Sequence, residues 1–179
     1  MIGTVMKEAR EEKGITQQEL GQLSFLSHKT ISAIETGKRR LTKENLKNIC
    51  KELDDPKLYF EAASEIMGDV FSLDWLDGDA ADLHRAAVRE KVIEELHEAV
   101  QAITLTKTSK NPKACDEKDI ENIVKSIQET IDVYKASAIY IVVMCKEYSQ
   151  DIKKMFRIQK EKMIERRYLR GKVKCSMKK

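Results

Sequence analysis

The chain has 179 residues, of which 41% are apolar and 35% charged, with only 7 Gly and 2 Pro. So few turn-forming residues, with aromatic side chains at 6%, disfavour a β-sandwich or barrel and favour a helical protein. No apolar run approaches the roughly 18 residues that a membrane-spanning helix needs, and the N-terminus lacks a signal-peptide pattern. We therefore expect a cytoplasmic protein without a membrane contact.

Charge is distributed unevenly along the chain. Residues 1–60 carry 11 Lys and Arg against 9 Asp and Glu, residues 61–149 carry 10 against 18, and residues 150–179 carry 12 against 3. A mildly basic head, an acidic middle and a strongly basic end indicate separate functional parts. The four cysteines stand far apart without a C-x-x-C pair, which argues against a zinc site or redox motif.

Helix signals follow one another closely in the first sixty residues. Residues 2–13 are predicted to form a helix that Gly14 ends. Thr16 and Glu19 have the spacing of a capping box, so a short second helix is expected to begin there. The buried face of that second helix is predicted to consist of Leu20 and Leu23.

Three further helices are predicted to complete this domain. Ser27 is a good N-cap for a third helix, which Gly37 ends, and Thr42 caps a fourth. Asp55 and Pro56 favour the start of a fifth helix, because Pro fits the first helical position. The buried positions of the third and fourth helices are predicted to be Ile31, Ile34, Leu46, Ile49, Cys50 and Leu53.

The stretch ITQQELGQLSFLSHKTISAIETGKR, residues 15–39, resembles the helix-turn-helix of the Xre and lambda-repressor-like family, of the phage-repressor type. The match is gapless, and the resemblance extends over a five-helix domain at residues 1–62. It implies a DNA-binding transcriptional regulator whose third helix enters the major groove. Gly21 fits the place where the two short helices touch, since that contact needs a small residue.

The resemblance also implies DNA contacts at individual positions. Gln17 occupies the family's usual phosphate contact, and Lys29 has the reach and charge to read guanine. Basic residues after the third helix would follow the DNA backbone and supply affinity rather than sequence choice. Arg10 and Glu35 match a pair that bridges helices in the family, which we interpret as structural. The expected DNA-binding residues are Gln17, Ser27, His28, Lys29, Thr30, Ser32, Ala33, Lys38, Arg39 and Arg40.

One residue departs from the family's pattern. The turn between the second and third helices usually holds Gly, because the backbone there favours a left-handed conformation, but this chain has Phe25. Either the turn has a different geometry, or it accepts strain of about 1–2 kcal/mol. An exposed Phe25 could also serve as a contact surface.

The middle of the chain is predicted to be a linker followed by a helix. Residues 63–79 lose helical regularity, and the apolar residues expected to dock this linker are Phe71, Leu73 and Trp75. A helix is predicted over residues 80–104, with Asp79 well placed to begin it. The apolar stripe of that helix is predicted to be Leu83, Ala87, Ile93, Leu96, Val100 and Ile103.

After a polar loop at residues 106–118, neither Pro nor Gly occurs until Gly171. Apolar residues there alternate steps of four and three, a heptad pattern typical of a coiled coil or bundle. The seam consists of Ile120, Val124, Ile127, Ile131, Tyr134, Ala138, Ile141, Cys145, Tyr148, Ile152 and Met155. A single helix of about 50 residues would reach roughly 75 Å, about twice the length of the preceding helix. The uncovered part therefore needs another partner, most simply a second copy of the chain.

Oligomerisation through this seam, with a dimer favoured, is assigned to Ile120, Val124, Ile127, Ile131, Tyr134, Ile141, Tyr148 and Ile152. An intramolecular bundle core is the alternative for the same pattern. The run AIYIVVMC at residues 138–145 is β-branched, but the continuing heptad favours helix over strand. The basic tail from residue 153 onward could contact phosphates, dock on the acidic middle segment or lie in solvent.

We therefore expect an all-α protein with a helix-turn-helix domain at residues 1–62, a linker at 63–79, and a helical regulatory or oligomerisation module at 80–179. The predicted function is that of a repressor that binds a palindromic operator as a dimer, in a bacterial cytosol or a phage-infected host. The alternative is a protein-interaction module, an antitoxin or anti-repressor, whose C-terminal helices bind another protein. No catalytic, metal-binding or cofactor-binding constellation stands out, so no enzyme activity, metal or cofactor is expected.

Overall fold

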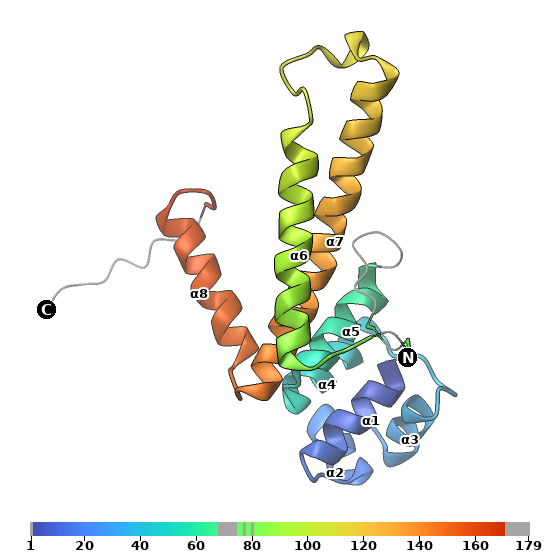
Figure 1. Cartoon of the computed structure of the whole chain (residues 1–179). Helices are drawn as coiled ribbons and strands as arrows, with labels where there is room; N and C mark the ends of the chain where they lie inside the picture. The colour runs from blue at the N-terminus through green and yellow to red at the C-terminus, as the bar shows by residue number, and fades with distance from the viewer. Residues whose placement is uncertain (1, 68–74, 77, 80, 171–179) are drawn as a thin grey trace, which may run out of the picture.

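The computed structural model describes residues 2–67, 75–76, 78–79 and 81–170. Within these ranges the fold is all-α, as predicted, with the chain folded into helices and connecting turns. The helices are α1 (Ile2–Glu12), α2 (Gln17–Ser24), α3 (His28–Glu35), α4 (Lys43–Leu53), α5 (Pro56–Met67), α6 (Arg85–Thr104), the 3-10 turn η1 (Pro112–Ala114), α7 (Glu117–Glu147) and α8 (Ile152–Glu165). Helices α1 to α5 form a compact N-terminal bundle, from which α6 and α7 project as a long antiparallel hairpin (Figure 1).

The predicted caps of the N-terminal bundle are confirmed. The Thr16 hydroxyl accepts from the Glu19 amide while the Glu19 carboxylate accepts from the Thr16 amide, which is a complete capping box. Ser27 and Thr42 cap α3 and α4, because their hydroxyls accept from the Thr30 and Asn45 amides. Each of these residues satisfies amides that the first helical turn would otherwise leave without a partner.

The core of the bundle contains the predicted apolar positions of α3 and α4, together with Met6, Leu20 and Leu58. The prediction for Leu23 is wrong, because this side chain is 48% exposed. The buried face of α2 consists instead of Leu20, Gly21 and Ser24. Ser24 can take an interior position because its hydroxyl donates to the Leu20 carbonyl at 2.6 Å.

Helix α5 continues to Met67 and therefore enters the segment that the sequence predicted as a linker. Its last turns are rich in Ala and Glu, which are good helix formers, and Ala62 lies in the core. Trp75 docks as expected, with its ring edge-on to Phe60 at 5.4 Å between centroids. Phe71 and Leu73 lie outside the described residues.

The base of the hairpin packs against α5 through a second apolar cluster. Its buried members are Phe60, Val88, Ile139, Val142, Val143, Cys145 and Ile152. Lys146 adds ion pairs to Asp55 at 3.3 Å and to Glu12 at 3.1 Å. These contacts fix the hairpin on the N-terminal bundle, and the run at residues 138–145 is helical as predicted.

Helix α6 differs from its prediction at both its start and its buried face. The N-cap is His84, whose Nδ1 accepts from the Ala86 amide at 3.3 Å. Asp79 does not begin the helix, because α6 starts at Arg85 and the Ala81 amide donates to the Gly78 carbonyl. The residues buried on α6 are Val88, Glu95, Ala99 and Ala102. Leu96, Val100 and Ile103, predicted as part of the apolar stripe, are exposed.

The predicted single C-terminal helix is wrong, since α7 and α8 are separate helices joined by residues 148–151. Ser149 has a φ of 51°, which ends α7, and the Asp151 side chain caps α8 by accepting from the Lys154 amide. This break involves neither Gly nor Pro, so the composition of the stretch did not indicate it. Helix α8 then diverges from the hairpin (Figure 1).

Candidate nucleic-acid interface

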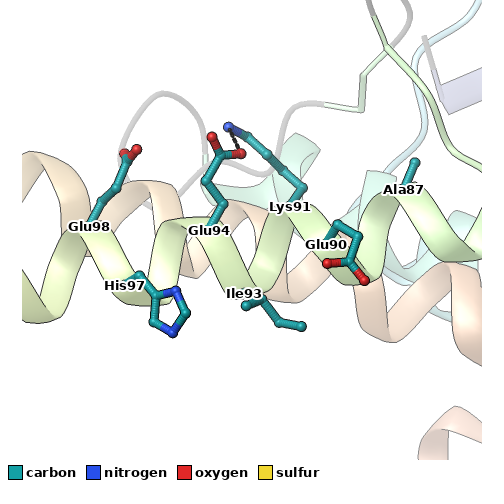
Figure 2. Close-up of a pocket in the computed structure, with 7 residues that line it drawn as sticks. All are labelled: Ala87, Glu90, Lys91, Ile93, Glu94, His97 and Glu98. Carbon is teal, nitrogen blue, oxygen red and sulfur yellow. Dashed lines mark hydrogen bonds and ion pairs between the residues drawn. The ribbon is translucent and has the colours of Figure 1, made fainter.

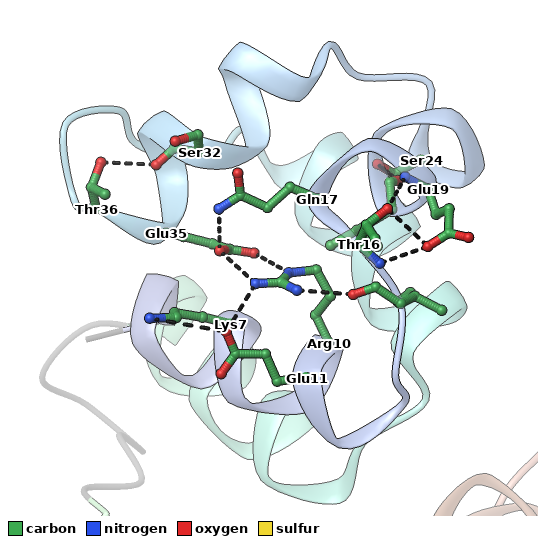
Figure 3. Close-up of polar contacts among 12 residues, drawn as sticks. Lys7, Arg10, Glu11, Thr16, Gln17, Glu19, Ser24, Ser32, Glu35 and Thr36 are labelled. Atoms are coloured by element: carbon green, nitrogen blue, oxygen red, sulfur yellow. Dashed lines mark hydrogen bonds and ion pairs between the residues drawn. The ribbon is translucent and has the colours of Figure 1, made fainter.

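A buried ion pair holds α1, α2 and α3 in their relative positions (Figure 3). The Arg10 guanidinium donates to the two Glu35 carboxylate oxygens at 2.6 and 3.0 Å, and also to the Ile15 carbonyl at 2.9 Å. The hydrogen bond with Glu35 raises the pKa of Arg10 above its ordinary value. The pairing of these two residues agrees with their predicted structural role.

Gln17 joins the same network, because its Nε2 donates to Glu35 at 2.8 Å (Figure 3). The side chain predicted to contact phosphate is therefore oriented by a carboxylate at the end of α3. This link spans 18 residues of sequence, and no local pattern indicates it. It fixes the first turn of α2 relative to α3, the two elements that would approach DNA together.

The turn between α2 and α3 has the left-handed backbone that the family's Gly would allow. Phe25 has φ 60° and ψ 35°, so of the two alternatives the strained turn is the one observed. The Leu26 amide donates to the Gly21 carbonyl at 2.8 Å. A Cβ atom on Gly21 would lie 2.6 Å from the Leu26 carbonyl oxygen, which explains the small residue there. The Phe25 side chain is 89% exposed.

The predicted contact residues of α3 gather on its N-terminal half and its outer side. His28 and Lys29 are exposed, whereas Thr30, Ser32 and Ala33 are half-buried. Ser27, the N-cap, accepts from the Thr30 amide at 3.1 Å. The exposed charge and hydrogen-bonding groups of this helix thus point away from the bundle core.

The basic residues after α3 fold back against that helix. The amides of Lys38 and Arg39 both donate to the Ala33 carbonyl, at 2.8 and 3.0 Å. The Arg39 guanidinium donates to the Thr30 hydroxyl at 3.4 Å. Lys38, Arg39 and Arg40 are exposed. The structure therefore brings Lys38 and Arg39 beside α3 and gives Thr30 a contact that the sequence did not reveal.

The predicted oligomerisation residues lie on the hairpin, away from this surface. Ile120, Val124, Ile127, Ile131, Tyr134, Ile141 and Tyr148 are between 37% and 54% exposed. Ile152 does not belong with them, because the chain turns before α8 and buries this residue in the cluster at the base of the hairpin.

Among the described residues, one group of carboxylates is close enough to share a cation. Oxygen atoms of Glu95, Glu129 and Asp132 lie within 4.8 Å of one another between α6 and α7. Lys91 pairs with Glu95 at 2.8 Å, and this contact raises the pKa of Lys91 above its ordinary value. A lysine therefore supplies positive charge to this group.

A capped α2–turn–α3 unit with an exposed basic edge defines a DNA-binding regulatory domain. Residues 6–55 match the family model described as helix-turn-helix. The N-terminal domain is therefore a helix-turn-helix domain of the Xre and lambda-repressor-like kind, which supports a role in DNA-binding transcriptional regulation.

Beyond the family model, the comparisons give no relatives. Neither the curated proteins nor the solved structures contain a match to this chain. None of the helices in the described ranges is long and apolar enough to cross a membrane.

Proposed function

We propose that this chain is a sequence-specific, repressor-type regulator that binds a palindromic operator as a dimer. The observation that carries the proposal is that Lys29 is exposed in the first turn of α3 while the exposed Arg39 bonds to Thr30 of the same helix. An exposed helix with a basic edge fits the major groove, which admits one α-helix. The helix-turn-helix domain at residues 1–62 would bind DNA, and the helices after residue 80 would assemble the dimer.

Individual side chains have distinct roles in this proposal. Lys29 donates to guanine O6 and N7, while His28 and Ser32 bond base edges or phosphates. Ala33 is small enough to meet a thymine methyl group. Gln17, Lys38, Arg39 and Arg40 contact the DNA backbone, so they raise the affinity for every sequence alike. Ser27 and Thr30 hold the start of α3, since their hydroxyls lie 2.9 Å apart.

Selection of bound duplexes from a random DNA library, with the full-length protein at physiological salt, tests this function. We expect an enriched motif with two inverted half-sites about one helical turn apart, or a multiple of that spacing. Lys29→Ala should change the preferred base at one position of each half-site, at about 1–3 kcal/mol per contact. Lys47→Ala, an exposed lysine on α4, is the matched control. An unchanged motif with Lys29→Ala would refute the proposed reading face.

A protein-interaction role is the second candidate. It is favoured by an apolar groove of about 450 Å³ between α7 and α8, lined by Tyr140, Met144, Tyr148, Met155 and Phe156 among others. If the library yields no motif and binding is weak and salt-sensitive, an antitoxin or anti-repressor becomes the better description. A stable complex with the product of a neighbouring gene would then support it.

A further inference from the structure

The α6–α7 hairpin has an unusual inner seam. In its outer half, away from the N-terminal bundle, the residues buried between the two helices are Glu95, Ala99, Ala102, Asp119 and Ser126. These side chains are small or polar. A pair of helices gains most of its stability by burying large apolar side chains, and this seam buries few of them.

Large apolar side chains point outward from the same stretch. On α6 the exposed residues are Leu96, Val100 and Ile103, and on α7 they are Ile120, Val124, Ile127, Ile131 and Tyr134, with Ile141 nearer the base of the hairpin. The heptad pattern of α7 is therefore not used to pack α6. Helix α6 packs against a different side of α7. The predicted seam remains exposed from Ile120 to Tyr134, whereas its members Cys145 and Ile152 are buried at the base.

The two exposed stripes lie on one face of the hairpin. Leu96 and Ile103 each follow a buried residue of the inner seam by one position, as do Ile120 and Ile127 on α7. One position is a rotation of about 100° in the same sense on both helices. Since the helices run antiparallel (Figure 1), equal rotations turn both stripes to the same side.

The outer side of α6 has a different character. Lys91, Glu94 and Glu98 project from it (Figure 2), and Lys91 pairs with Glu94 at 2.9 Å. These side chains are exposed and charged, as expected for a surface in water. Apolar exposure on α6 is thus confined to the side that continues into the α7 stripe.

We infer that a second copy of this chain covers the apolar face, so that two α6–α7 hairpins form a four-helix bundle with both helices in the interface. This deepens the proposed function by specifying the surface of its dimer, and it rests on that proposal only for the number of copies. A face with a 3.5-residue repeat is complementary to another helix with the same repeat. A second hairpin supplies that repeat in full.

The size of the face also fits a second copy. The nine outward residues are each 37–61% exposed. Together they offer on the order of 800 Å² per copy, which is about what each partner buries in a standard protein–protein interface. Within the chain, α8 approaches this face only at Ile141, which lines the groove between α7 and α8, and then diverges from the hairpin (Figure 1).

The contribution of α6 is the feature to test, because a coiled coil of α7 alone would leave α6 outside the interface. Molar mass is measured by sedimentation equilibrium for the full-length protein and for Val100→Asp. We expect a dimer for the wild type and at least a 100-fold weaker dimer for the variant. Gln101→Asp adds the same charge at the neighbouring exposed position on the other side of α6 and should remain dimeric.

Two further variants separate dissociation from misfolding. Val100→Ser should weaken the dimer without adding charge, and Val100→Met should preserve it, with helix content followed by circular dichroism. A wild-type protein that is monomeric would overturn the inference, and so would one whose apolar face binds a different protein. So would a Val100→Asp variant that folds and stays fully dimeric.

The outcomes also separate this inference from the DNA-binding proposal. A monomeric wild type that still enriches a single half-site from the DNA library would overturn the bundle and leave sequence-specific DNA binding intact. A dimer that dissociates with Val100→Asp but enriches no motif would support the bundle and contradict the proposed function.

Discussion

Phe25 holds a backbone conformation that costs free energy for any residue with a Cβ atom. Its φ of 60° and ψ of 35° are left-handed, and Gly adopts this region without the clash. We therefore expect Phe25→Gly to raise the free energy of unfolding by about 1 kcal/mol, as measured by urea denaturation. The gain should be modest, because Gly also increases the entropy of the unfolded chain.

Phe25→Ala is the control for this substitution. It removes the same exposed ring but keeps the Cβ atom, so it should leave the strain in place. Equal stability of the Gly and Ala variants would mean that the turn is not strained by its backbone. Comparing the DNA affinity of Phe25→Ala with that of the wild type then tests whether the ring itself contacts a partner.

The Arg10–Glu35 pair should have a measurable effect on the free energy of unfolding. Its side chains are only 8% and 1% exposed, so removing one partner leaves a buried charge uncompensated. Arg10→Met should lower the free energy of unfolding by about 3 kcal/mol. The double variant Arg10→Met/Glu35→Met should recover most of that loss, because it leaves no unpaired charge. A double variant as unstable as the single one would show that the pair acts through shape and not charge.

Among the elements, α7 begins with a charged cluster whose strength depends on pH. Asp116 and Asp119 form a capping box, and Lys110 and Lys107 pair with Asp119. The hydrogen bond from Lys110 holds the pKa of Asp119 well below its ordinary value. The contact therefore contributes its full stability above the unfolded pKa of about 3.9. That contribution is lost as the pH falls below this value toward the folded pKa.

Thermal unfolding of wild type and Asp119→Asn should follow this dependence. The variant should melt at a lower temperature at neutral pH, and the difference should shrink as the pH is lowered below about 4. Glu117→Gln changes an exposed carboxylate in the same helical turn and should show a smaller difference. A difference between wild type and Asp119→Asn that grows toward acid pH would contradict the assigned direction of the pKa shift.

The elements that the sequence predicted well are those specified by neighbouring residues. Thr16, Ser27 and Thr42 each cap a helix through a bond to an amide three residues on, so a short window contains the whole signal. The departure at Phe25 was visible for the same reason, although the sequence left open whether the turn keeps a left-handed geometry. Contacts such as Gln17 with Glu35 and Arg39 with Thr30 join residues 18 and 9 positions apart, and no pattern of neighbouring residues specifies them.

The hairpin shows why periodicity alone was insufficient. The heptad correctly indicated a helix over α7, although it was predicted to continue through the break before α8. An apolar stripe also does not say which partner covers it. The intrachain contact uses Ala99, Ala102 and Ser126 instead, since small residues let two helices approach closely. The break after α7 was also missed, because Ser149 takes a positive φ that its residue type does not demand.

For the whole molecule, the position of the hairpin links assembly to DNA binding. Lys146 and the apolar cluster around Phe60 join the base of α7 to the N-terminal bundle. If hairpins associate, two helix-turn-helix domains are tethered to each other. The second half-site is then bound at an effective local concentration in the millimolar range, without any new DNA contact.

Ile127→Asp should separate the assembly of the hairpins from DNA binding by the N-terminal domain. Ile127 is exposed on α7, far along the chain from α3, so the substitution leaves the DNA-facing side chains unchanged. We expect the affinity for a duplex with two half-sites to fall at least 100-fold, toward that for a single half-site, because the tethering advantage is about 10²–10⁴. Affinity for one half-site, followed by fluorescence anisotropy at fixed salt, should not change. Equal losses on both duplexes would mean instead that the substitution disturbs the N-terminal domain, and no loss on either would separate the hairpin from operator binding altogether.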